Sequence, residues 1–467
     1  MAQTVSDTAL AELRAQLAGD VITPDHAAYE EARKVWNGVI DRRPAAIVRP
    51  TSAKEVAAAI AFTRANGLEL AVRGGGHAFG GSGTVDGGIV IDLGAMRQVE
   101  VDPQAKIVRA GGGAQWGDVD AATQEHGLAV TGGLISHTGI GGLTLGGGMG
   151  WLTRKAGLSI DSLVGAEVVT ADGRILRASE NENSDLFWAL RGGSGNFGVV
   201  TKFEFRLHEV GPLCHLGFYF WTADRGGEAL KFARDYVTGL SDDFGVVAVG
   251  LDAPPAPFIP EQFHGKAGWG LLVLGVRDDA EAHAQAVEAV TAARPDVEFV
   301  TPIPYVAVQQ LLNEGNEHGV LGYEKAVWMD TLPDGAIEVL TACITERASL
   351  LSGIPIFVFG GAFGRVPDDA TAFSGSRRSL FAVNVAGQAA ADQPEVYEQE
   401  RAWVRRVWQD LVPYASGSGS YVNFMSEYEE DRVRQSYGAK YERLQRIKRE
   451  YDPENVFHRM AGNIKPA

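Results

Sequence analysis

The 467-residue sequence has few cysteines, fewer basic than acidic residues, and no long apolar run. Neither Cys214 nor Cys343 belongs to a C-x-x-C pair, which argues against a zinc site or a redox dithiol. Two free thiols in the core are the first interpretation, with one disulfide as the alternative. We therefore predict a protein without a metal site.

The formal net charge of −17 argues against nucleic acid and anionic membranes as partners, because both attract clustered Lys and Arg. Its simplest meaning is solubility. No stretch is long and apolar enough to span a membrane. Residues 1–17 include acidic residues and lack a continuous apolar core, so they do not resemble a secretory signal. We expect a cytoplasmic protein that is a monomer or a homodimer.

Glycine is the abundant residue, with 58 copies that cluster between residues 74 and 198. Such clusters indicate backbone that turns tightly or lies close to a ligand. The length favours two domains. A helix is predicted over residues 52–67, with Ser52 and Glu55 as a capping box. A hairpin is predicted over residues 164–179, and a helix near the end stops at Asp452-Pro453. Strands and helices are mixed throughout, so the predicted fold class is α+β.

The segment Gly193–Gly198 matches the pattern G-x-G-x-x-G. A dinucleotide fingerprint needs a strand before the pattern and a helix after it. Here the predicted order is reversed, with a helix over 181–192 and a strand over 199–207. We therefore predict no nicotinamide cofactor at this segment.

Two other glycine segments are more informative. The segments 73–81, RGGGHAFGG, and 139–150, GIGGLTLGGGMG, are both predicted to be loops that turn successive N–H groups toward an anion. The alternative is that the glycines serve tight turns or close strand crossings. His77 stands among small neighbours in the first loop, where it does not pack a core. Neutral imidazole is a nucleophile, so His77 is expected to face whatever the loop binds.

Several longer runs carry a family resemblance. Residues 49–81, 85–93, 139–158 and 185–205 together resemble the vanillyl-alcohol-oxidase superfamily of FAD enzymes. YVNF at 421–424 and YDPENVFHRMAGNIKP at 451–466 resemble the C-terminal segment of its berberine-bridge-enzyme-like branch. The resemblance covers nearly the whole chain, more loosely between residues 212 and 410.

The resemblance implies a split FAD domain, with residues 1–211 and a returning segment 411–467 around a substrate domain of residues 212–410. It implies that His77 is bonded to the 8α-methyl carbon of the flavin. Ile135 stands where many members carry a second flavin-linked cysteine, so single attachment is expected. The FAD-binding residues are then Gly74, Gly75, Gly76, His77, Ala78 and Phe79 with Arg73 at the start of their loop, Thr138, Gly139, Gly141, Gly142 and Gly146, Gly198 and Val200, and Asn423 and Asn463.

The catalytic base is less well indicated. The second tyrosine of the family's Tyr-x-Asn-Tyr motif is here Phe424, which has no ionisable group. The nearest candidate is Tyr421, followed by Tyr323 and Asp330. On a strand, Tyr421 and Phe424 would point to opposite faces. Seven aromatic residues line the pocket or belong to the core: Tyr219, Phe220, Trp221, Tyr323, Trp328, Phe357 and Phe359.

The resemblance implies a hydride transfer from an alcohol or amine carbon of a small organic substrate to the flavin, and then to molecular oxygen with release of hydrogen peroxide. Thr138 aligns with a position that gates oxygen access in relatives. The missing hydroxyl at Phe424 favours either amines, because a neutral amine needs no base, or a base placed elsewhere in the chain. The alternatives are a dehydrogenase with another electron acceptor and a flavoprotein that sequesters a drug-like compound.

Overall fold

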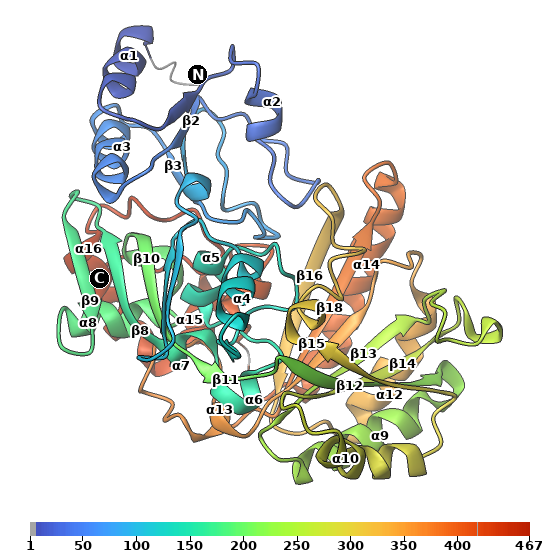
Figure 1. Ribbon diagram of the computed structural model, residues 1–467. Helices are drawn as coiled ribbons and strands as arrows, with labels where there is room; N and C mark the ends of the chain where they lie inside the picture. The colour runs from blue at the N-terminus through green and yellow to red at the C-terminus, as the bar shows by residue number, and fades with distance from the viewer. Residues whose placement is uncertain (1–5, 418) are drawn as a thin grey trace.

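A computed structural model describes residues 6–417 and 419–467. Residues 1–5, where the segment examined for a secretory signal begins, lie outside the described part. Three larger sheets organise the chain, and helices cover their faces (Figure 1). Within the described ranges, no helix is both long and apolar enough to cross a membrane.

The N-terminal part forms a four-stranded sheet in the order β1 (Asp20–Ile22), β2 (Ala46–Arg49), β4 (Ile89–Asp92), β3 (Leu70–Arg73). The helices α1 (Asp7–Ala15) and α3 (Ala53–Ala65) pack on it, and α2 (Tyr29–Ala32) follows β1. The predicted helix at 52–67 is confirmed, and the hydroxyl of Ser52 accepts from the N–H of Glu55. The capping box itself is wrong, because the Glu55 carboxylate accepts from the N–H groups of Thr51 and Gly19 instead.

A five-stranded antiparallel sheet follows in the order β5 (Val99–Asp102), β6 (Ile107–Gly111), β10 (Val199–Arg206), β8 (Leu163–Val169), β9 (Ile175–Ser179). Its core includes side chains of α4 (Trp116–Gln124), α8 (Ser184–Leu190), α15 (Glu430–Tyr437) and α16 (Tyr441–Tyr451). The C-terminal helices therefore return to the first half of the chain, where Figure 1 shows them in red beside green strands. The predicted hairpin at 164–179 is confirmed as β8 and β9.

Shorter elements connect these sheets. They are β7 (Leu128–Ala129) paired with β11 (His208–Glu209), and the helices α5 (Ile140–Gly146), α6 (Thr153–Ala156) and α7 (Ser159–Ser162). The second glycine segment was predicted as a loop, and this is wrong for residues 140–146, which form α5. The core contacts of Ile140 and Leu145 outweigh the low helix propensity of its glycines. The order α8, then Gly193–Gly198, then β10 confirms the reversed pattern.

The middle of the chain forms a seven-stranded antiparallel sheet: β15 (Val297–Pro304), β12 (Leu213–Thr222), β14 (Ala267–Gly275), β13 (Phe244–Asp252), β17 (Ile354–Val358), β18 (Phe381–Ala389), β16 (Leu321–Met329). The helices α9 (Gly226–Tyr236), α12 (Asp334–Cys343) and α14 (Pro394–Leu411) share a core with one face of it. Also in this part are α10 (Ala280–Ala292), α11 (Tyr305–Val308) and α13 (Ala362–Arg365). The domain limits at 211 and 410 stay a prediction.

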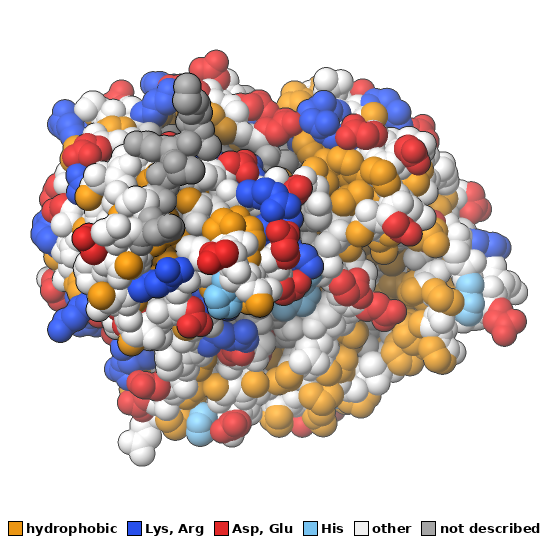
Figure 2. Space-filling model, turned by 90° about the horizontal axis from the view of Figure 1, so that it is seen from above, with side chains coloured by type: hydrophobic (Ala, Val, Ile, Leu, Met, Phe, Trp, Pro, Cys, Tyr) orange, Lys and Arg blue, Asp and Glu red, His pale blue; other side chains and the backbone are white. Residues whose placement is uncertain are grey.

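Cys214 and Cys343 are both buried and free, as expected for core thiols. On the face seen in Figure 2, acidic and basic side chains are interspersed among apolar ones. The expectation of no nucleic-acid partner stays a prediction.

Candidate active site

The two glycine segments of the sequence meet in space. A Cβ on Gly75 would lie 2.2 Å from the backbone nitrogen of Gly139, and a Cβ on Gly139 would lie 2.2 Å from the nitrogen of Gly75. The loop after β3 and the N-terminal end of α5 therefore touch backbone to backbone, which only glycine permits. Gly142, on the next turn of α5, is exposed, and a Cβ there would meet no atom within 4 Å. The junction thus leaves open space beside the glycines.

His77 projects from the loop at this junction. The indole ring of Trp36 stacks on its imidazole with centroids 5.4 Å apart and planes inclined by 21°. Its Nε2 lies 2.8 Å from Nδ1 of His137, which belongs to the segment before α5. Burial, followed by the nearby His137 and His318, lowers the pKa of His77 to about 3. The ring is therefore neutral at physiological pH and fixed in orientation.

His318 completes a group of three imidazoles. Its ring centroid lies 5.7 Å from that of His77 and 5.6 Å from that of His137. Burial is the main cause that lowers the pKa of His137 and of His318 below the usual value. His318 is exposed, whereas the other two are half-buried, so the group leads from the glycine junction to solvent. The prediction that the chain has no metal site stays a prediction.

The segment 421–424 packs against α5. The side-chain amide of Asn423 donates to the carbonyl of Leu143 at 3.0 Å and to the hydroxyl of Tyr421 at 2.9 Å. A Cβ on Gly146 would lie 2.1 Å from Oδ1 of Asn423, so a larger residue here would displace the Asn423 side chain. The expected strand is wrong: residues Val422–Phe424 form a 3-10 turn. The turn brings the rings of Tyr421 and Phe424 together, with centroids 4.9 Å apart.

Aromatic side chains from the seven-stranded sheet surround Tyr421 and Phe424. The Trp328 ring lies 6.0 Å from that of Tyr421, and the Phe357 ring lies 5.8 Å from that of Phe424. Phe359 belongs to the same cluster. Of the other aromatics considered, Tyr219, Trp221 and Tyr323 lie in the core beneath the helices, and Phe220 lies in a separate cluster. The structure therefore places three of the seven near Tyr421.

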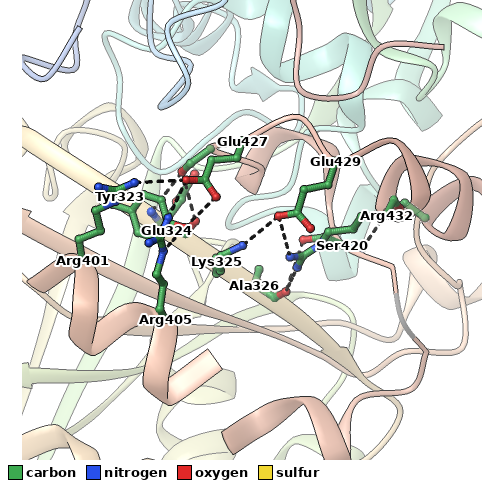
Figure 3. Close-up of polar contacts among 12 residues, drawn as sticks. Tyr323, Glu324, Lys325, Ala326, Arg401, Arg405, Ser420, Glu427, Glu429 and Arg432 are labelled. Atoms are coloured by element: carbon green, nitrogen blue, oxygen red, sulfur yellow. Dashed lines mark hydrogen bonds and ion pairs between the residues drawn. The ribbon is translucent and has the colours of Figure 1, made fainter. Parts of the chain in front are cut away.

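The three candidate bases do not lie together. Tyr323 lies on the face of β16 opposite to that of Trp328. Its hydroxyl contacts Glu427 and Arg405 there, each at 3.2 Å (Figure 3). Asp330 follows the end of β16 and accepts from the hydroxyl of Ser379. Tyr421 alone belongs to the aromatic cluster. Burial raises its pKa, and its oxygen accepts hydrogen bonds from Gly148 and Asn423.

Glu324 is a buried acid that the sequence analysis missed. It shares a face of β16 with Trp328, opposite to the face of Tyr323, because side chains alternate along a strand. It is 2% exposed and accepts from the side-chain amide of Asn384 at 2.8 Å, on the neighbouring strand β18. Burial raises the pKa of Glu324 to about 8. The available signal was charge within an otherwise apolar run, YEKAVW. The sequence alone did not reveal on which face of the strand Glu324 lies.

One oxygen of Glu324 has no partner. Within the described residues, neither Oε1 of Glu324 nor Oδ1 of Asn384 has a hydrogen-bond partner, although both atoms are buried. Opposite and beside them on this face stand alanines 326, 382 and 386, which fill little space. Unsatisfied buried polar atoms are costly and call for an explanation by function or by a bound molecule. This face therefore offers two unsatisfied polar atoms next to the aromatic cluster.

The other residues predicted to bind FAD lie in different environments. Arg73 is 6% exposed, and its guanidinium pairs with Asp92 at 3.0 Å, so it holds β3 and β4 together. Phe79 packs against Trp36, with centroids 4.9 Å apart. Oδ1 of Asn463 is buried without a described partner. Ala78 follows His77 in the first loop, and Thr138 precedes Gly139. Gly198 lies just before β10, and Val200 is its second residue.

Comparison with known proteins agrees with this arrangement. Residues 44–179 match the model of an FAD binding domain, and residues 420–464 match that of berberine and berberine-like proteins. The (R)-6-hydroxynicotine oxidase of Paenarthrobacter nicotinovorans is 32% identical over 96% of this chain and 97% of its own. An FAD-linked oxidoreductase of Dictyostelium discoideum is 29% identical over 94% of this chain and 92% of its own.

Solved structures have the same fold. The 6-hydroxy-D-nicotine oxidase of Arthrobacter nicotinovorans superposes with a TM-score of 0.81 at 28% identity, covering 97% of this chain and 98% of its own. A glucooligosaccharide oxidase of Acremonium strictum, described with a 6-S-cysteinyl, 8α-N1-histidyl FAD, gives a TM-score of 0.85 at 24% identity, covering 99% and 100%. The fold and the glycine junction define a two-domain FAD-dependent oxidoreductase. The chain belongs to the berberine-bridge-enzyme-like branch of the vanillyl-alcohol-oxidase superfamily.

The residues present fit FAD. The glycine junction supplies unhindered backbone beside open space, which suits a pyrophosphate. The orphaned side-chain oxygen of Asn463 offers a polar group. His77 offers a neutral imidazole at the same junction.

Proposed function

We propose that this chain is an oxidase that holds FAD through a single covalent bond to His77. The observation that supports it most directly is a neutral imidazole fixed at the contact between Gly75 and Gly139. Ile135 cannot form a second bond, because it has no nucleophilic atom. The residues of both glycine segments, with Gly198, Val200, Asn423 and Asn463, would hold the cofactor. The division into residues 1–211, 212–410 and 411–467 is part of this proposal.

Bound FAD would supply the acceptor for a hydride from an alcohol or amine carbon, with molecular oxygen as the final electron acceptor and hydrogen peroxide as the product. The protein's part is to orient the substrate and to move its proton. Trp328, Phe357 and Phe424 would pack against an organic substrate. Glu324 would accept the substrate proton, while the amide of Asn384 holds its carboxyl in place. Tyr421 remains the alternative, although its raised pKa makes the phenol a donor rather than a base.

The presence of Glu324 changes the expected substrate. Alcohol oxidation requires removal of a hydroxyl proton as the hydride leaves. With a carboxyl on the substrate face of β16, the phenylalanine at position 424 no longer favours amines over alcohols. Both classes stay in the proposal, and the similarity to the 6-hydroxynicotine oxidase supports a ring-bearing amine as the first to test.

The test is anaerobic reduction of the purified yellow protein by a panel of sugars, phenolic alcohols and cyclic amines. An oxidase should bleach with one class, and readmitted air should restore the colour with one equivalent of peroxide. Bleaching without rapid reoxidation by air would instead show a dehydrogenase. Tight binding of a panel member without bleaching would support the sequestering flavoprotein.

A further inference from the structure

The ring nitrogens of His77 are not equivalent. Nε2 faces Nδ1 of His137 at 2.8 Å, whereas no partner of Nδ1 of His77 is found among the described residues. The stacked ring of Trp36 and the tilted ring of His137, 4.7 Å away between centroids, hold the imidazole in this orientation. Only Nδ1 of His77 is therefore free to form a new bond.

Both rings are neutral, so a single proton lies between them. A neutral imidazole has one N–H and one lone pair. If Nε2 of His77 carries the proton and donates it to Nδ1 of His137, then Nδ1 of His77 keeps the lone pair and is nucleophilic. The opposite tautomer would place a hydrogen on Nδ1 of His77 and block attack. The orientation of one hydrogen bond thus decides whether His77 can react.

We propose that His137 is the positioning residue for flavin attachment: it selects the reactive tautomer of His77 and takes its Nε2 proton as the bond forms. This rests on the proposed covalent link to His77. Nδ1 of His77 bonds to the flavin 8α carbon, which loses one proton, and the Nε2 proton of His77 passes to Nδ1 of His137. Two electrons remain on the flavin ring, and molecular oxygen removes them with two protons as hydrogen peroxide.

His318 provides the way out for the proton. It is the exposed member of the group, and ligand atoms of all three rings lie within 4.8 Å of one another. A proton taken by His137 can therefore reach water without crossing the buried side of the site. Carboxylates face this end, with Glu317 beside His137 and Glu31 beside His318. Their charges stabilise the imidazolium that forms transiently.

The experiment follows flavin attachment rather than turnover. Full-length protein made under riboflavin limitation is mixed with FAD, and the acid-stable flavin is measured with time. His137→Ala removes both functions, whereas His137→Asn keeps an acceptor atom at the Nδ1 position but cannot take the proton. His126→Asn, an exposed histidine at the end of α4, is the matched control. If the flavin-free protein does not fold, the covalent fraction in freshly purified variants gives the same comparison.

We expect attachment to slow by at least about tenfold in His137→Ala, approaching the ~100-fold typical of a lost proton acceptor, with unchanged non-covalent FAD affinity. The attachment rate of His137→Asn should lie between those of the wild type and His137→Ala. Added imidazole should speed flavin attachment in His137→Ala. EDTA should change none of these rates. Attachment of His137→Ala at the wild-type rate, or slowing only in proportion to lost FAD affinity, overturns the inference. If wild type releases all its flavin in acid, the covalent link itself fails, which is a different result.

Discussion

The side-chain amide of Asn384 donates a 2.8 Å hydrogen bond to the carboxyl of Glu324, across the neighbouring strands β18 and β16. The pair lies on the sheet face that carries Trp328, and its two oxygen atoms without a described partner are both buried. Under the proposed role of Glu324, a substrate proton would pass to this pair.

Glu324→Gln should lower the rate of flavin reduction by the best panel substrate by about 100-fold or more, the usual loss for a general base. In wild type the rate should rise with pH through about 8, as the carboxyl ionises, and level off above it, and this rise should be absent in the variant. Tyr421→Phe should cost less than about tenfold. Rapid-mixing absorbance under anaerobic conditions measures all three. A larger loss in Tyr421→Phe than in Glu324→Gln would return the role of base to the tyrosine.

Glu324 should also affect stability. Its pKa in the folded state, about 8, lies above the ordinary 4.5, so the folded state binds one more proton between these values. Stability from this group is therefore full below pH 4.5 and is lost as pH rises to 8, at up to about 1.4 kcal/mol per pH unit. Urea unfolding of Glu324→Gln should lack this slope. The control is Glu427→Gln, whose carboxyl has a lowered pKa and is not expected to titrate in this window. Equal slopes in wild type and Glu324→Gln would contradict the prediction.

Two glycines of α5 should respond differently to alanine. Gly146→Ala would place a Cβ against Asn423, so it should destabilise the protein and loosen the 421–424 turn. Gly142→Ala meets no protein atom and should stabilise the flavin-free chain by up to about 1 kcal/mol through helix propensity. If FAD occupies the space beside Gly142, the same change should weaken FAD binding. Thermal unfolding with and without FAD separates the two effects; unaltered affinity in Gly142→Ala would place the cofactor elsewhere.

No nicotinamide cofactor should bind at Gly193–Gly198. The pattern follows α8 and precedes β10, so the segment lacks the helix that would receive a pyrophosphate. Titration with NADH should show no saturable binding and no rapid bleaching of the flavin. Micromolar affinity for either nicotinamide coenzyme would disprove this prediction.

Local patterns predicted local structure well. The helix after Ser52, the hairpin at 164–179 and the reversed order around Gly193 depend on neighbours in sequence, and all three are observed. Glycine content alone could not distinguish a loop from α5, because contacts of Ile140 and Leu145 with distant side chains decide the outcome. The same limit applies to YVNF, which reads as a strand but turns because Asn423 is held by Leu143.

The site residues show where such reasoning ends. His77 and the glycines can be identified from composition, because an imidazole among small residues is not expected to pack in a core. The residues that contact them cannot be identified in this way. His137 and Glu324 acquire meaning only from a contact with a residue 60 positions away in each case, His77 and Asn384, and a single sequence does not specify such pairings.

The hydrogen bond between the Gly148 amide and the Tyr421 hydroxyl joins residues 273 positions apart. At elongation rates of about 5–20 residues per second, roughly 14–55 s separate the synthesis of these two residues. Over that interval the nascent chain exposes the glycine segments without the C-terminal turn that covers them. Cofactor capture before Tyr421 has been synthesised would therefore meet an incomplete site. Slower translation between the codons of Gly148 and Tyr421 should delay loading without changing the finished holoprotein.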